Sequence, residues 1–422
     1  MLPLADMMMK RIEEEEWRLT EQIDHQLQDQ YQQIDRTVAR NQEKVLSAFW
    51  EAGLVDNQLW GSTGYGYGDR GRDQLELIYA KTFATEAALV RPHLVSGTHA
   101  LKVAFFGLLR PGNTLLYATG EPYDTLQTVI GATVNAAGSL REFGIDYKEV
   151  DLRTDGGIDI ERVIAAVDHS VRVIAIQRSP GYAWRRALSV HEIGVAIHTI
   201  KNAHPHVMIV IDNCYGEFTD QDEPSAYGAD LVVGSLIKNP GGGLAPTGGY
   251  LVGSKKAVEL AAYHLTAPGI GGESGSYENY RLFFQGLFLA PHVVGQALKG
   301  NLFASEFLGR MGFTCDPVTS QNVRDIVLKI HLGSKERLIA FCQAIQASSP
   351  VDAHAIPEPW QMPGYQDPVI MAAGTFVQGA SIELSADGPI RPPYVAYMQG
   401  GLTLEHVKIA MIHVMRKLKT VI

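Results

Sequence analysis

The stretch GSLIKNPGGGLAPTGGY, residues 234–250, places Lys238 between a short apolar run and a row of glycines. A phosphate-binding P-loop has glycines before the lysine, Ser or Thr after it, and then a helix. Here the glycines follow Lys238, Asn239 comes next, and the following element, GGYLVG, has the composition of a strand. The stretch therefore excludes a P-loop. It predicts a lysine beside a glycine-rich turn, where burial would favour the neutral, nucleophilic amine needed to bond a cofactor.

The bulk composition indicates a globular protein with a substantial core. The chain has 422 residues, of which 46% are apolar, and a formal net charge of −10. This charge argues against nucleic acid as a partner, and no apolar run approaches membrane-spanning length. The three cysteines are widely spaced, which predicts neither a disulfide framework nor a metal site. The acidic start MLPLADMMMKRIEEEE resembles no targeting peptide, so we expect a cytoplasmic protein.

Short apolar runs alternate with helical patterns from about residue 89 to 298. This alternation predicts an α/β layer with a mostly parallel sheet. ALVRPHLV, NTLLYA, VRVIAIQ, VMIVID, ADLVVGS and GGYLVG are its expected strands. VRDIVLKI and GASIELS predict a smaller α+β sheet beyond residue 298, and IPEPWQMPGYQDP an irregular loop. The predicted units are an N-terminal helical segment (1–60), a large domain (61–298) and a small C-terminal domain (299–422).

The N-terminal segment has apolar residues at three- or four-residue steps, from Ile23 to Val38, before Gly53. This period predicts an amphipathic helix that ends at the glycine. Its apolar stripe needs a covering surface, which we expect a second copy of the chain to supply.

Two strand ends carry polar groups suited to ligand binding. SGTHA, residues 96–100, is expected to follow a strand and open a helix, whose first amides form an anion site. An ordinary helix cap is the alternative. Asp212 comes directly after an apolar strand, where a carboxylate requires a cation or hydrogen-bond donors. Cys214 lies two residues further on, and a small packed side chain is the preferred interpretation of it.

In SGTHA, IDNCYGEF and GSLIKNPGGG, in that order, the chain resembles the fold type I pyridoxal-phosphate enzymes, and Lys238 follows Asp212 by 26 residues. More narrowly, it resembles the group named both aluminium-resistance proteins and methionine gamma-lyase-like proteins. GYGYGDRGRDQLE, FFQGLFLAP and DGPIRPPY carry that likeness.

The resemblance implies a role for each matching residue. Lys238 would hold pyridoxal 5'-phosphate covalently and move protons, and Asp212 would pair with the pyridine nitrogen. Tyr123 matches the aromatic residue that stacks on the cofactor ring, although a surface turn tyrosine is the alternative. The phosphate would receive hydrogen bonds from a set drawn from two strand ends, namely Gly97, Thr98 and Ser235.

The family's lyases also reach the phosphate with a tyrosine and an arginine from the neighbouring subunit. Tyr65 or Tyr67 with Arg70 or Arg72 would serve here, which implies a homodimer or homotetramer. Arg391, in GPIRPPY, is the candidate to hold the substrate α-carboxylate, and a surface arginine in a Pro-rich turn is the alternative.

The reaction implied by the resemblance is cleavage of a carbon–sulfur bond in a sulfur amino acid, a small-molecule substrate, by β- or γ-elimination. Transamination uses the same cofactor and remains an alternative. A third hypothesis is a non-catalytic stress-response protein that retains the cofactor. The presence of both Lys238 and Asp212 argues against it, because binding the cofactor for stability alone does not need an electron sink.

Overall fold

The computed structural model describes residues 11–133, 136–321 and 323–421 of the chain. Its larger sheet has seven strands. In spatial order they are β1 (Ala87–Arg91), β7 (Gly249–Gly253), β6 (Leu231–Ser235), β5 (Met208–Asp212), β4 (Val171–Gln177), β2 (Thr114–Tyr117) and β3 (Asp146–Glu149). Strand β7 is antiparallel to both neighbours, and the other pairs are parallel. The predicted mostly parallel α/β sheet is confirmed.

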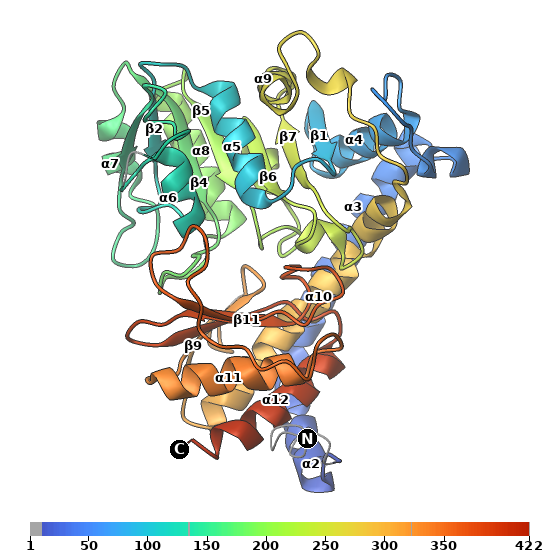
Figure 1. The fold of residues 1–422 in the computed structure, drawn as a ribbon, viewed down its shortest axis with the longest axis vertical. Helices are drawn as coiled ribbons and strands as arrows, with labels where there is room; N and C mark the ends of the chain where they lie inside the picture. Colours follow the sequence, from blue (N-terminus) through green and yellow to red (C-terminus); the bar gives the residue numbers. More distant parts are fainter. Residues whose placement is uncertain (1–10, 134–135, 322, 422) are drawn as a thin grey trace.

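Helices cover both faces of this sheet (Figure 1). They are α4 (Arg70–Thr82), α5 (Gly97–Leu108), α6 (Asp124–Ile130), α7 (Ile160–Ala166), α8 (Val190–Ala203) and α9 (Lys255–Leu265). Alternate residues of the central strands enter two different hydrophobic clusters, Ile174 and Ile209 one, Val173 and Val210 the other. Because both faces are buried, the central strands are continuous apolar runs.

Three details of the strand prediction are wrong. ALVRPHLV was expected to be one strand, but strand β1 ends at Arg91. The residues PHLV that follow form a turn, in which the Leu94 amide donates to the Arg91 carbonyl at 3.2 Å. The strand stops there because Pro92 has no amide hydrogen to donate to a neighbouring strand. Most of GASIELS is likewise a turn, and the strand there is β11 (Ser385–Pro389). The polar edge strand β3 escaped prediction because its sequence, DYKE, is partly exposed and lacks an apolar pattern.

The smaller sheet has five antiparallel strands. In spatial order they are β10 (Val369–Ala372), β11, β12 (Val395–Gln399), β9 (Val327–His331) and β8 (Thr314–Asp316). Helices α11 (Lys335–Ala347) and α12 (Leu404–Leu418) lie on the side away from the large sheet (Figure 1). The irregular loop predicted before β10 is present.

Three long helices connect these parts. They are α2 (Glu14–Gln26), α3 (Gln28–Ala52) and α10 (Arg281–Arg310), and α10 runs beside α3 from the large sheet to the small one (Figure 1). The predicted stop at Gly53 is confirmed, since it caps α3 in the left-handed conformation with φ of 65°. The predicted domain boundary at 298/299 falls inside α10, and the domain limits stay a prediction.

The apolar stripe of the N-terminal helices is covered within the chain itself. Ile23 and Leu27 are fully buried with residues of α10 and α12. The cover that this stripe needs is therefore supplied by the chain's own helices, and the homo-oligomer stays a prediction. Within the described ranges, no helix combines the length and apolarity needed to cross a bilayer.

Candidate active site

A cavity lies at the carboxyl ends of the parallel strands, where α/β sheets bind ligands. The loop after β6 brings Lys238 to it, and the end of β5 brings Asp212. The other lining residues come from the end of β4 and from the loops after β2, β4 and β5: Tyr123, Gln177, Ser179, Gly181, Cys214 and Tyr215. The ammonium nitrogen of Lys238 lies 3.8 Å from the centre of the Tyr215 ring. Lys238, Asp212 and Tyr123, three residues expected to act together, thus border one cavity.

The charge of Asp212 is balanced inside the site. Its carboxylate accepts a hydrogen bond from the Cys214 amide at 3.2 Å. Burial raises the pKa of Asp212, while the nearby Lys238 ammonium and the Cys214 hydrogen bonds lower it. Burial lowers the pKa of Lys238, but Cys214, Tyr215 and Asp212 raise it more, so it lies above the ordinary value. Burial thus favours the neutral amine, as expected, but these three neighbours together outweigh it in the protein on its own.

The N-terminus of α5, where we expect the anion site, lies against Cys214, which lines this cavity. Ser96 caps the helix, its hydroxyl accepting from the His99 amide at 3.0 Å, so the preceding amides of Gly97 and Thr98 belong to the open first turn. A Cβ on Gly97 would lie 3.3 Å from Cys214 Sγ and 3.6 Å from Ser235 Cβ. The glycine therefore brings the helix terminus against the ends of β5 and β6.

The side chains around the N-terminus of α5 differ in whether their polar groups already have hydrogen-bond partners. Ser235 is buried. Its hydroxyl makes only one long contact, 3.5 Å to the Gly248 carbonyl. The Thr98 hydroxyl is bonded to that of Thr125 at 2.7 Å. Burial raises the pKa of the Cys214 thiol, so it stays protonated at neutral pH, in keeping with a packed side chain.

Tyr123 is held firmly rather than lying in a surface turn. Its amide donates to Gln177 Oε1 at 3.0 Å, and its hydroxyl is bonded to that of Tyr365 at 2.7 Å. Its ring lies 5.8 Å from that of Tyr182. Tyr365 belongs to the loop before β10, so the small domain supplies part of the aromatic wall. These contacts remove the surface-turn alternative for Tyr123.

The residues expected to act from a neighbouring subunit are on the outer surface of this chain. Tyr65 and Tyr67 are stacked on each other, with 77% and 64% of their surface exposed, and Arg70 is also exposed. Arg72 is buried and donates to the Gly66 and Glu273 carbonyls, so it holds the loop in place. No described contact joins Tyr65, Tyr67 or Arg70 to the cavity of the same chain.

Arg391 lies outside the residues that line the cavity. It is exposed and pairs with Asp367 at 3.0 Å, in the loop that also carries Tyr365. It lies near the start of α6: burial raises the pKa of Asp124, and the Arg391 charge lowers it. Arg391 therefore lies on the Tyr123 side of the site, and its guanidinium is already paired with Asp367 of the same chain.

Several lining residues were missed by the sequence reasoning. Gln177 ends β4 and Ser179 follows it, and the carboxyl end of this strand was not searched for chemistry. Tyr215 lies within the quoted motif IDNCYGEF and adopts a left-handed backbone, with φ of 73°, which a bulky residue seldom adopts. Tyr365 and Tyr182 carry no sequence pattern, since only the tertiary fold brings them to Tyr123.

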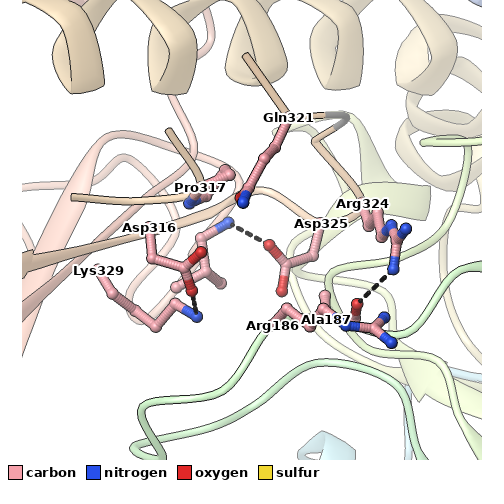
Figure 2. Close-up of a pocket in the computed structure, with 9 residues that line it drawn as sticks. Arg186, Ala187, Asp316, Pro317, Gln321, Arg324, Asp325 and Lys329 are labelled. Atoms are coloured by element: carbon pink, nitrogen blue, oxygen red, sulfur yellow. Dashed lines mark hydrogen bonds and ion pairs between the residues drawn. The ribbon is translucent and has the colours of Figure 1, made fainter. Parts of the chain in front are cut away.

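A second cavity lies where the 186–187 loop meets β8 and β9 (Figure 2). Its charged groups already have partners: Lys329 pairs with Asp316, and Arg324 donates to Glu192 at 2.8 Å. Asp325 accepts from Ser179 Oγ at 2.8 Å, which connects this cavity to the first one. The paired charges fix the small sheet against the large domain.

The comparisons with known proteins agree with this geometry. The family model described as methionine gamma-lyase matches residues 16–419. The chain belongs to the methionine gamma-lyase family. It is 53% identical over 383 residues to an uncharacterized Bacillus subtilis protein, YnbB, covering 90% of this chain and 91% of that protein.

Two solved structures have nearly the same fold as this family member. One is a carbon-sulfur lyase involved in aluminium resistance from Clostridium novyi, with TM-score 0.93 and 48% identity over 99% of this chain and 100% of that one. The other is a Listeria monocytogenes protein described as a candidate cystathionine beta-lyase involved in aluminium resistance, with TM-score 0.92 and 49% identity over 95% and 99%. A pyridoxal-phosphate-dependent protein of Escherichia coli, YhfS, shares the fold alone, at 16% identity and TM-score 0.60.

Proposed function

We propose that this protein is a pyridoxal-phosphate-dependent lyase that cleaves a carbon–sulfur bond in a sulfur amino acid. The observation that carries the proposal is the placement of Lys238 and Asp212 at one cavity, with the N-terminus of α5 at its edge. Membership of the methionine gamma-lyase family supports the same reaction class.

The residues present fit this cofactor by their chemistry. A lysine can bond the aldehyde, and a carboxylate can keep the pyridine nitrogen protonated. The phosphate matches the open amides of Gly97 and Thr98 and the weakly bonded Ser235 hydroxyl, because a helix N-terminus favours anions. Bound in this way, pyridoxal phosphate accepts electron density from the α-carbon of the amino acid and so acidifies its hydrogen.

The protein's own groups position the substrate and move protons. In this proposal Lys238 would take the proton from the α-carbon and pass it on, after first losing its own proton, whose pKa Cys214, Tyr215 and Asp212 raise. Tyr123 lines the cavity with Tyr182 packed beside it, and this aromatic surface would limit the access of water. Arg391 is proposed to hold the α-carboxylate once it leaves Asp367.

In the net β-elimination, the bonds from the α-carbon to hydrogen, from the β-carbon to sulfur and from the α-carbon to nitrogen all break, the β-carbon gains a proton, and the oxygen of water becomes the ketone oxygen of the 2-oxo acid. The sulfur leaves as a thiol after gaining one proton, and one water is consumed. The products are the thiol, a 2-oxo acid and ammonium.

A panel of sulfur amino acids tests the proposal, with thiol, 2-oxo acid and ammonium measured together. We expect equal amounts of the three products, and their loss in Lys238→Ala. Lys256→Ala, an exposed lysine of α9, is the matched control and should keep wild-type activity. Conversion to a 2-oxo acid without thiol release would indicate transamination, and no reaction with any amino acid would favour a non-catalytic role.

A further inference from the structure

Thr125 lies in the first turn of α6 and meets the first turn of α5, where we expect the cofactor phosphate. Its hydroxyl is 2.7 Å from that of Thr98, the second residue of α5, whose amide is open. Among the residues that the structure describes, neither hydroxyl has another hydrogen-bond partner. The two helices thus contribute one hydroxyl each to a pair beside the expected anion site.

Counting hydrogens shows what this pair can offer to an anion. A threonine hydroxyl has one hydrogen and two lone pairs, and either hydroxyl can be the donor in this contact. If Thr98 donated, it would present only lone pairs to an anion, and the Thr125 hydrogen would have gone to no acceptor. If Thr125 donates, the Thr98 hydrogen is left for the anion, and accepting one hydrogen bond strengthens Thr98 as a donor of the next.

The small domain holds Thr125 in place through residues 361–367, which we call the strap. A Cβ on Gly364 would lie 3.4 Å from Thr125 Cγ2, so the strap backbone packs on the methyl side of this threonine. Gln366 Nε2 donates to Gln127 Oε1 at 3.3 Å, one turn position further along α6, and the tyrosine pair described above joins the same two segments. Because the methyl and the hydroxyl of a threonine share one carbon, packing of the methyl fixes the direction of the hydroxyl.

We propose that Thr125 is a positioning residue of the phosphate site, which donates to Thr98 Oγ1 so that the Thr98 hydrogen is directed to the anion. Thr125 acts through Thr98 and makes no contact with the phosphate itself. The strap, by holding Thr125, makes the small domain contribute to phosphate binding. This assignment rests on the proposed cofactor and adds a residue to its site.

Binding of two aldehydes to the full-length protein, freed of cofactor, tests the assignment. Pyridoxal phosphate and pyridoxal, which lacks the phosphate, are titrated separately, and Kd is taken from the visible absorbance that Lys238→Ala does not develop. Thr125→Val keeps the shape of the side chain and removes the hydroxyl. We expect it to raise Kd for pyridoxal phosphate about 2- to 10-fold, the range of a hydrogen bond between uncharged groups, and to leave Kd for pyridoxal unchanged.

Thr199→Val is the matched control. Thr199 is an exposed residue of α8 whose hydroxyl donates to the Val195 carbonyl of its own helix at 2.8 Å, so neither Kd should change. If the wild type binds neither aldehyde, the proposed function fails and takes the assignment with it. If the wild type binds pyridoxal phosphate and Thr125→Val binds it equally well, the proposed function stands and the assignment falls. An equal loss of affinity for both aldehydes in Thr125→Val would indicate general damage to the site and would also overturn it.

A double-mutant cycle shows whether Thr125 acts through Thr98. Thr98→Val removes a donor to the charged phosphate and should raise Kd for pyridoxal phosphate about 10- to 100-fold. The double variant should match Thr98→Val to within two-fold, because Thr125 has no hydroxyl left to orient. Independent effects that multiply in the double variant would contradict the proposal. Should Thr98→Val fail to fold, the comparison of the two aldehydes in Thr125→Val decides the question alone.

Discussion

The buried carboxyl of Glu217 should make the protein less stable as the pH rises. Glu217 is fully buried, its Oε1 accepts from the Tyr250 hydroxyl at 2.8 Å, and its Oε2 has no partner within the described residues. Burial raises its pKa from 4.5 to about 8, with Glu223 raising it further and Tyr250 and Lys238 lowering it. The folded protein therefore keeps this proton at neutral pH.

The sign and size of the effect follow from the two pKa values. Below pH 4.5, Glu217 is protonated in both the folded and unfolded states, and its stabilising proton is fully present. Between pH 4.5 and 8 the unfolded state loses the proton first, so the free energy of unfolding falls by about 1.4 kcal/mol per pH unit. The full loss is on the order of 5 kcal/mol above pH 8.

Glu217→Gln tests this, because glutamine keeps the acceptor for Tyr250 and has no charge to bury. Its apparent Tm should match that of wild type near pH 5 and exceed it by ~5 °C at pH 8.5, since a chain of this length gives roughly 1 °C per kcal/mol. Differential scanning calorimetry at several pH values measures the difference.

Glu223→Gln is the matched control for that experiment. Glu223 accepts from Asn213 Nδ2 at 2.9 Å and from the Phe218 amide at 2.8 Å, and lies 3.8 Å from the Arg178 guanidinium. Removing its charge leaves Arg178 without its buried partner, so we expect lower stability at every pH. Parallel Tm profiles of wild type and Glu217→Gln from pH 5 to 8.5 would refute the reasoning.

Two further predictions concern the substrate and the subunits. Arg391→Lys should leave the cofactor bound and raise KM about 10- to 100-fold, because lysine lacks the two-pronged contact with a carboxylate; an unchanged KM in steady-state assays would remove Arg391 from the site. Arg70→Ala and Lys238→Ala should each be inactive, yet a mixture allowed to exchange subunits should recover about a quarter of wild-type activity if each dimer site uses both chains. No recovery, with sedimentation showing that mixed dimers form, would place Arg70 outside the neighbour's site.

The order of elements in the large domain could be predicted from local sequence. The apolar runs that end at Asp212 and Ser235 are buried on both faces of the sheet, so their composition alone marks them as central strands. The exposed strand Asp146–Glu149 has no such composition, and the turn after Arg91 depends on a proline in an apolar stretch. The elements that could not be predicted from the sequence are therefore those at the two edges of the sheet, where part of the strand is exposed.

The sequence by itself determined which chemistry this protein carries. Lys238 before its glycines, Asp212 after its strand and Gly97 at the opening of a helix each lie at a chain position whose local structure dictates their environment. Parallel strands then bring those ends to one edge of the sheet.

Only the tertiary structure decided what surrounds that chemistry. Cys214, Tyr215 and Asp212 together raise the pKa of Lys238, and the small domain brings Tyr365 to the hydroxyl of Tyr123 beside the site. Tyr365 is 242 positions from Tyr123 in the chain, and their pairing arises from the packing of the small domain against the large one. Local sequence pattern reports propensity and periodicity, whereas protonation and unmet hydrogen bonds depend on neighbours that only the folded chain supplies.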